Sequence, residues 1–203
     1  MSRIAVALCL SIALPSIAAA DDRDDRHEVG RDRRELHDDL HDARRAEWLL
    51  HEYDRLVALH DGRALDQLEN RVALALDDEL RDADRDTAAA AHDLRRADEE
   101  VREDRSDLER DRLQGGGAAG DFRELWKDRH SQENERHDFL AQADYRKRII
   151  ALRDQWSRLR GRYSREHLRS KHDLLEELVR LSRYEIRMDE QQLHEDHDKL
   201  RHD

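Results

Sequence analysis

The sequence predicts an all-α protein, built either as an elongated antiparallel helical hairpin with a coiled-coil seam or as a four-helix up-down arrangement. Three observations predict it. Hydrophobic residues recur at heptad spacing, no segment alternates with the period of two that is typical of a strand, and one glycine-rich cluster separates two arms of similar length. Of the 203 residues, 43% are charged and 37% hydrophobic, which is close to the composition of disordered chains. The prediction therefore depends on patterning rather than on composition.

The first 20 residues are typical of a secretory signal peptide. A short basic start precedes the apolar run 4–17, and the alanines 18–20 stand directly before a charged stretch that begins at Asp21. We expect cleavage at about Ala20–Asp21 and a periplasmic or secreted mature protein, with residues 21–31 as a flexible acidic N-terminus. The single cysteine, Cys9, lies in the apolar run, so no disulfide is expected.

The first helical arm, residues 32–113, carries the clearest coiled-coil pattern. Two columns of apolar or small residues run along it at spacings of three and four, and charged residues fill the flanking positions. Such a seam predicts a long helix that packs along a partner helix. The columns consist of Ala73, Leu80, Thr87, Leu94, Val101 and Leu108, and of Leu76, Ala83, Ala90 and Ala97.

Residues 114–120 contain four glycines and form the predicted hinge. Asp121 is expected to cap the following helix. In the second arm, residues 121–203, the apolar seam drifts around the helix, which indicates several short interfaces. Gly62 and Gly161 are candidate breaks that would give four helices instead of two arms. The apolar residues suffice for a two-in-seven seam but not for a three-in-seven face, which favours the hairpin and leaves the four-helix alternative open.

Charge is distributed unevenly between the arms. The range 77–111 contains 15 acidic and 7 basic residues, whereas the range 146–172 contains 10 basic and 2 acidic residues. One interpretation is that the two stretches dock against each other. The other is that the basic stretch binds anionic envelope lipid or polysaccharide. The residues predicted to bind the anion are Arg153, Trp156, Arg160, Tyr163 and Lys171. The net charge of −12 argues against a nucleic-acid partner.

Histidines make up 13 of the residues, and two pairs have a spacing suited to metal binding. His37 and His41 are four residues apart, and His194 and His197 are three apart, so each pair lies on one helical face. Folding about residue 117 would align positions whose numbers sum to about 234, and thus the two pairs. We therefore predict a Zn²⁺, Ni²⁺ or Cu²⁺ site that joins the two ends of the chain.

No catalytic motif was found: the sequence has neither a G-x-S-x-G elbow nor a P-loop, and we expect no enzyme. The leading hypothesis is a non-enzymatic interaction protein with a chaperone-like or envelope-stress role, using its seam or the aromatic residues Phe122 and Trp126 near the hinge to bind a protein partner or a second copy. The alternatives are a metal buffer or sensor and a binder of an anionic membrane surface. In composition the chain resembles small stress-induced periplasmic helical proteins, but it lacks the Leu-Thr-x-x-Gln motif of Spy-type chaperones.

Overall fold

The computed structural model describes residues 18–114 and 119–202, which form four α-helices. Helix α1 spans Ala18–Leu59, α2 spans Gly62–Gln114, α3 spans Ala119–Leu159 and α4 spans Arg165–His202. Within these ranges there is no strand, so the predicted all-α class is confirmed. None of the described helices is both long and apolar enough to span a membrane. The chain forms two compact units: one consists of residues 43–182, and the other joins the segments 1–42 and 183–203.

Two predicted boundaries differ from the structure. Helix α1 runs through residues 21–31, for which a flexible segment was expected, because no proline interrupts this stretch and a lone glycine costs a helix only about 1 kcal/mol. Helix α3 begins at Ala119, so Asp121 lies within its first turn rather than at its cap. Residues 1–17 of the predicted signal peptide and residues 115–118 of the predicted hinge lie outside the described residues.

The break between α1 and α2 falls two residues before Gly62, at His60–Asp61. His60 adopts a left-handed backbone with φ of 57°, and the N–H of Asp61 donates to the carbonyl of Leu56 at 3.2 Å, which is the C-terminal hydrogen bond of a Schellman motif. Asp61 then caps α2, because its Oδ1 accepts from the N–H of Ala64 at 3.0 Å. The helix therefore restarts at Gly62 because an aspartate precedes it, and the glycine is simply the first helical residue.

The break between α3 and α4 lies at the predicted glycine and is held by a buried ion pair. Gly161 takes a φ of 68°, and its N–H donates to Oε2 of Glu69 at 2.9 Å. The other oxygen of Glu69 accepts from Nζ of Lys171, which also donates to the carbonyl of Arg162 at 2.7 Å. Both charged side chains are buried, with Lys171 0% exposed. Because Glu69 belongs to α2, this network fastens the α3–α4 turn to α2.

Residues 43–182 contain one hydrophobic core to which all four helices contribute. Its centre is aromatic: Trp156 is only 1% exposed and its Nε1 donates to the carbonyl of Glu69 at 3.3 Å, while the hydroxyl of Tyr53 donates to the carbonyl of Leu168 at 2.8 Å. The buried members are Ala46, Leu49, Tyr53 and Leu56 of α1; Leu65, Leu68, Val72, Ala75, Leu76 and Ala83 of α2; Tyr145, Ile149, Leu152 and Trp156 of α3; and Leu175, Leu178, Val179 and Leu181 of α4.

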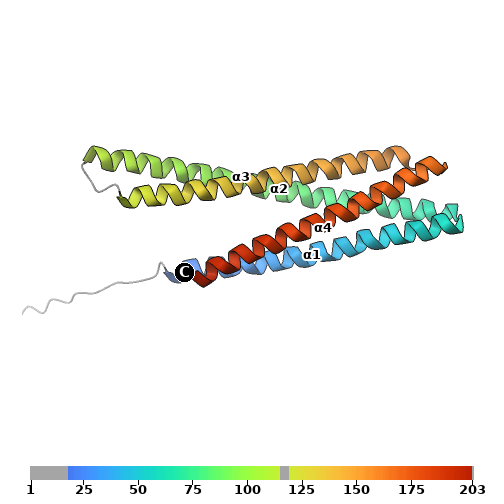
Figure 1. Ribbon diagram of the computed structural model, residues 1–203, viewed down its shortest axis with the longest axis horizontal. Coiled ribbons are helices and arrows are strands. Elements are labelled where there is room, and N and C mark those ends of the chain that lie inside the picture. Colours follow the sequence, from blue (N-terminus) through green and yellow to red (C-terminus); the bar gives the residue numbers. More distant parts are fainter. Residues whose placement is uncertain (1–17, 115–118, 203) are drawn as a thin grey trace, which may run out of the picture. The chain divides into compact units, whose positions relative to one another are not determined.

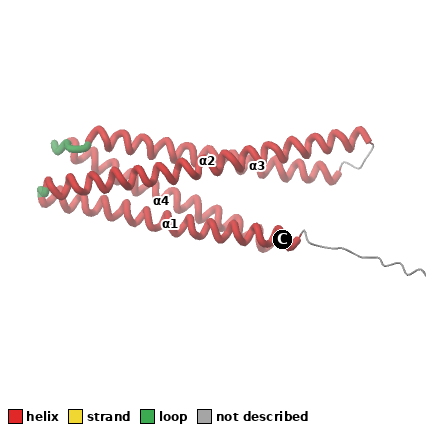
Figure 2. Tube along the Cα trace, turned by 180° about the vertical axis from the view of Figure 1, so that it is seen from behind, coloured by secondary structure: helices red, strands yellow, loops and turns green. Residues whose placement is uncertain are grey.

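Helices α2 and α3 form an antiparallel hairpin that continues from this core to the hinge (Figures 1 and 2). All ten residues of the two predicted columns are buried or half-buried, which confirms the seam. Polar side chains of α2 also pair with polar side chains of α3 across this interface. In each pair the two residue numbers add up to 230, whereas folding about residue 117 predicted a sum of 234, a difference of about one helical turn. The pairs are Asp84 with Arg146, Asp77 with Arg153, and Asp98 with Gln132. The packing of the two helices, rather than the position of the hinge, decides this offset.

In the smaller unit the first part of α1 lies beside the last part of α4 (Figures 1 and 2). Half-buried leucines occur on both segments, among them Leu36 on α1 and Leu193 on α4.

Candidate functional site

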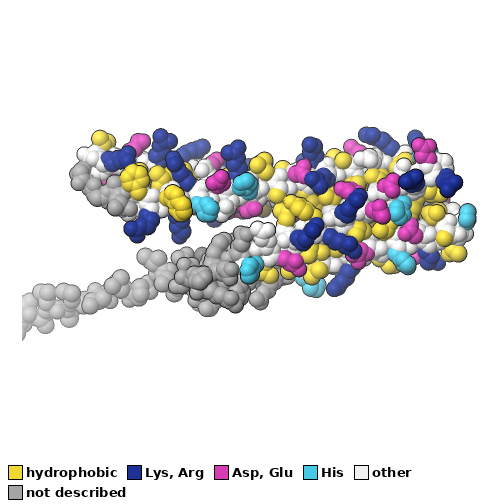
Figure 3. All heavy atoms as spheres, in the orientation of Figure 1, with side chains coloured by type: hydrophobic (Ala, Val, Ile, Leu, Met, Phe, Trp, Pro, Cys, Tyr) yellow, Lys and Arg dark blue, Asp and Glu magenta, His cyan; other side chains and the backbone are white. Residues whose placement is uncertain are grey.

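Three large hydrophobic side chains lie exposed at the hinge end of the α2–α3 hairpin, and we call them the tip patch. Leu113, in the last turn of α2, is 89% exposed, and Phe122 and Trp126, in the first turns of α3, are 48% and 71% exposed. Figure 3 shows hydrophobic side chains on this end of the hairpin, among many charged ones. Phe122 and Trp126 are four residues apart, so they share one face of α3.

The tip patch is bordered by cationic and imidazole groups. The guanidinium of Arg112 lies 5.0 Å from the centre of the Phe122 ring, which links the last turn of α2 to the start of α3. The imidazole of His130 stacks on Trp126 with ring centres 6.0 Å apart and planes 12° apart. Each aromatic ring has one such contact and still leaves much of its surface exposed.

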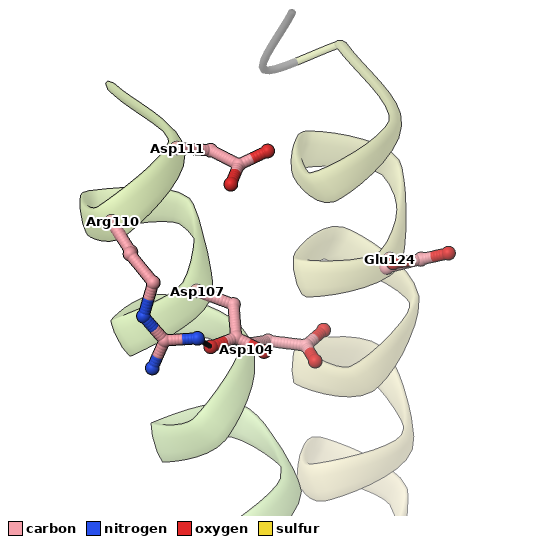
Figure 4. A pocket seen from close by; sticks show the side chains of 5 residues that line it. All are labelled: Asp104, Asp107, Arg110, Asp111 and Glu124. Carbon is pink, nitrogen blue, oxygen red and sulfur yellow. Dashed lines mark ion pairs between the residues drawn. The ribbon is translucent and has the colours of Figure 1, made fainter. Parts of the chain in front are cut away.

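An acidic hollow lies at the same end of the hairpin (Figure 4). Its lining residues are Asp104, Asp107, Arg110 and Asp111 of α2 and Glu124 of α3, and the α2 carboxylates of Asp104 and Asp111 point toward α3. Arg110 pairs with Asp107 at 2.7 Å. Among the buried side-chain polar atoms that the structure describes, Oδ2 of Asp104 is the one without a hydrogen-bond partner.

The position of Asp104 between the helices changes its acidity. Burial raises the pKa of its carboxyl to about 6, and the hydrogen bond to Asp128 and the negative charge of that neighbour add to the increase. Below pH 6 the Asp104 carboxyl is mostly protonated and can donate to Asp128. Above it, two carboxylates face each other across the α2–α3 interface.

The structure does not bring the predicted anion-binding residues to one surface. Trp156 is part of the core and Lys171 is paired with Glu69, so neither side chain reaches solvent, and the prediction is wrong for both. The remaining three bind within the protein: Arg153 donates to Asp77 at 2.5 Å, Arg160 donates to Asn70, and Tyr163 donates to Asp66 and lies over Nζ of Lys171.

The alternative interpretation of the basic stretch describes the structure better. Arg146 and Arg153 both pair with aspartates of the acidic range 77–111, across the α2–α3 interface. Opposite charges of the two arms therefore pair across the α2–α3 interface at these two positions.

The predicted terminal metal site remains a prediction. His37 and His41 are exposed, and their Nδ1 atoms lie 3.7 and 3.5 Å from Oδ1 of Asp38 and Asp42. His194 is also exposed, and the side chain of His197 lies outside the described part of the chain. The two pairs belong to the same compact unit. No metal-ligand cluster of three or more residues includes them in the ranges that the structure describes.

A different group of metal-ligating side chains was not recognised in the sequence. His172, Asp173 and Glu176, in the first half of α4, place one potential ligand atom each within 4.8 Å of the others. The spacing of His172 and Glu176, four residues apart, was a readable signal. The sequence alone did not single out this spacing, because the chain has many histidines close to carboxylates. Only the fold shows that a carboxylate of another helix lies beside His172.

The fold and these sites define the class of protein: a four-helix, highly charged protein with an exposed apolar tip. Comparisons with descriptions of protein families, with curated proteins and with solved structures found no match to this chain. Its function therefore has to be argued from its own residues.

Proposed function

We propose that this protein is an exported, non-enzymatic helical protein with a chaperone-like role, and that it binds non-native polypeptide chains through the tip patch. Export is supported by the apolar run 4–17 and the small residues 18–20 that follow it. The partner that fits the patch is a polypeptide that exposes apolar side chains, which folded proteins keep buried.

The observation that carries the proposal is the exposure of Leu113, Phe122 and Trp126. Large apolar side chains are scarce in this chain, and those of Trp156 and Tyr53 are almost completely buried in the core. Because Trp126 is 71% and Phe122 is 48% exposed, each forgoes a part of the about 1.5–3 kcal/mol that full burial of a large apolar side chain contributes. Aromatic side chains that are exposed but held in position are typical of binding hot spots.

The surroundings of the patch suit a transient partner. Three residues offer less apolar area than a permanent interface uses, so complexes are expected to form and dissociate rapidly. Arg112 lies against the Phe122 ring, and the exposed residues Arg123 and Lys127 each stand directly after one of the two aromatic residues in the sequence, so charged groups are available for the polar rim of an interface. The high content of charge elsewhere keeps such a complex soluble.

The proposal is tested by following the aggregation of a reduced, disulfide-containing client protein by light scattering. We expect the full chain to slow aggregation at near-stoichiometric ratio, both with and without a metal chelator. Trp126→Ser is expected to weaken this effect by several-fold, because the most exposed aromatic contact is lost.

The matched control is Trp48→Ser, since Trp48 is also a partly exposed tryptophan but lies on α1, 5.7 Å beneath Arg71. It is expected to leave the suppression of aggregation nearly unchanged. If the full chain does not slow aggregation, the proposed function is wrong. If both tryptophan variants weaken the effect equally, the tip patch is not the binding surface.

A further inference from the structure

We infer that His172, Asp173 and Glu176 of α4, oriented by Asp54 of α1, form a binding site for a divalent transition metal, with Zn²⁺ as the ion that fits the ligands best. The inference does not rest on the proposed function, because this site and the tip patch share no residue. It also differs from the predicted terminal site, which uses other histidines.

The first argument is the ligand geometry. His172 and Glu176 lie one helical turn apart on the same face of α4, and Asp173 stands beside the histidine. Their ligand atoms lie within 4.8 Å of one another, while the ligands of a tetrahedral zinc ion stand about 3.4 Å apart. The carboxylates of Asp173 and Glu176 are exposed, so rotation of their side chains can close the difference without moving the helix.

The second argument is the orientation of the imidazole. Nε2 of His172 lies 3.4 Å from Oδ1 of Asp54 on α1, and Nδ1 lies 3.9 Å from Oδ1 of Asp173. A proton on Nε2 directed at Asp54 leaves the lone pair of Nδ1 on the side of the Asp173 carboxylate. A carboxylate behind the histidine is the usual second contact of a metal-bound imidazole, since it holds the tautomer and makes the ring a stronger ligand.

The third argument is the unbalanced charge. In the described part of the chain, Asp54, Asp173 and Glu176 have no ion pair with lysine or arginine. Their sequence neighbours do: Glu177 pairs with Arg180 at 2.7 Å and Glu52 pairs with Arg55 at 2.6 Å. A divalent cation would neutralise carboxylates that the chain leaves without a cationic partner.

The choice of ion follows from the ligand types. One imidazole nitrogen with carboxylate oxygens is a mixed set that zinc accepts readily, whereas calcium and magnesium prefer oxygen ligands alone. Three protein ligands leave one tetrahedral position to water. His172 is about one-third exposed, so an ion can reach it from solvent.

The test is a titration of the full chain with Zn²⁺ by isothermal titration calorimetry. We expect a zinc site that His172→Ala weakens by at least about 100-fold, because its single nitrogen ligand is lost, and that Asp54→Asn weakens by about 10-fold, as removal of an outer-shell partner does. Circular dichroism without metal checks that both variants fold, since alanine favours the helix at position 172.

The matched control is the triple variant His37→Ala/His41→Ala/His194→Ala, which removes the predicted terminal ligands and leaves α4 around His172 intact. It is expected to keep the zinc site that depends on His172 at unchanged affinity. The inference is overturned if the chain binds no zinc, or if the triple variant loses the site while His172→Ala keeps it. Equal weakening by both sets of substitutions also overturns it, because a site at His172 does not depend on the terminal histidines.

Discussion

Replacing Lys171 by methionine would remove the cation from the buried ion pair that fastens the α3–α4 turn to α2. The side chain of Glu69 would then keep its negative charge without the ammonium group, while the N–H of Gly161 still donates to it at 2.9 Å, and the carbonyl of Arg162 would lose its donor. Breaking one side of a buried ion pair costs about 3–5 kcal/mol. Since a domain of this kind is stable by about 5–15 kcal/mol, Lys171→Met should lower the unfolding free energy by a large part of the total.

The double variant Lys171→Met/Glu69→Leu shows which part of this cost is electrostatic. It contains no buried charge, so the penalty of an unpaired ion disappears. The N–H of Gly161 and the carbonyl of Arg162 still lose their partners, and because both hydrogen bonds are only part-buried, each loss costs about 0.5–1.5 kcal/mol. We therefore expect the double variant to be less stable than the unaltered protein by about 1–3 kcal/mol, and much more stable than the sum of the two single changes would suggest.

The assay is urea unfolding followed by far-ultraviolet circular dichroism. Arg146→Met is the matched control, because its ion pair with Asp84 is about half-exposed and should contribute less than about 1 kcal/mol. A loss below 1 kcal/mol for Lys171→Met would refute the reasoning, and so would a double variant that is as stable as the unaltered protein.

Two further predictions concern the acidic hollow and the helix breaks. Asp104 has a folded-state pKa of about 6 against 3.8 for the free group, so its favourable contribution is complete below about pH 4 and is lost as the pH rises through 6. Asp104→Asn should therefore raise the melting temperature at pH 7.5 and change it little at pH 5, and an equal change at both pH values would contradict this. Gly161→Ala should lower the unfolding free energy by about 1–2 kcal/mol, because alanine is strained at a φ of 68°. No atom lies within 4 Å of the added methyl group, so this backbone strain is the whole of the expected cost. His60→Gly should raise the unfolding free energy by up to about 1 kcal/mol, because His60 has a φ of 57° and glycine adopts this conformation without strain. Urea unfolding measures both variants. If both substitutions shift the unfolding free energy in the same direction, the assignment of backbone strain to these two positions is wrong.

The helices and their seam were predictable because they depend on local periodicity. The columns that contain Leu80 and Ala83 follow from spacings of three and four, and these positions are indeed buried or half-buried along α2. The break at Gly161 was also predictable, since a left-handed residue after a helix favours glycine. The break at His60 was displaced from the predicted glycine because a histidine takes the left-handed position there, and Asp61, as the cap, starts the next helix.

The candidate sites were predictable only in part. Phe122 and Trp126 stood out in the sequence because aromatic residues are rare in this chain, and both are exposed. The basic stretch looked like a ligand surface, but two of its arginines, Arg146 and Arg153, pair with aspartates of α2, and Lys171 pairs with Glu69. The group around His172 depends on Asp54, which lies more than one hundred positions earlier in the chain, on another helix.

The sequence by itself determined that the chain is helical and which columns are apolar, because these properties arise from neighbours within a few residues. Only the tertiary structure decided which charges meet. The register of α2 against α3 pairs Asp84 with Arg146, and the return of α4 along α1 brings His172 to Asp54. A chain with so many charged side chains offers many such pairings in sequence, and only the packing of the core selects among them. That selection buries Lys171 and leaves the aromatic tip of the hairpin exposed.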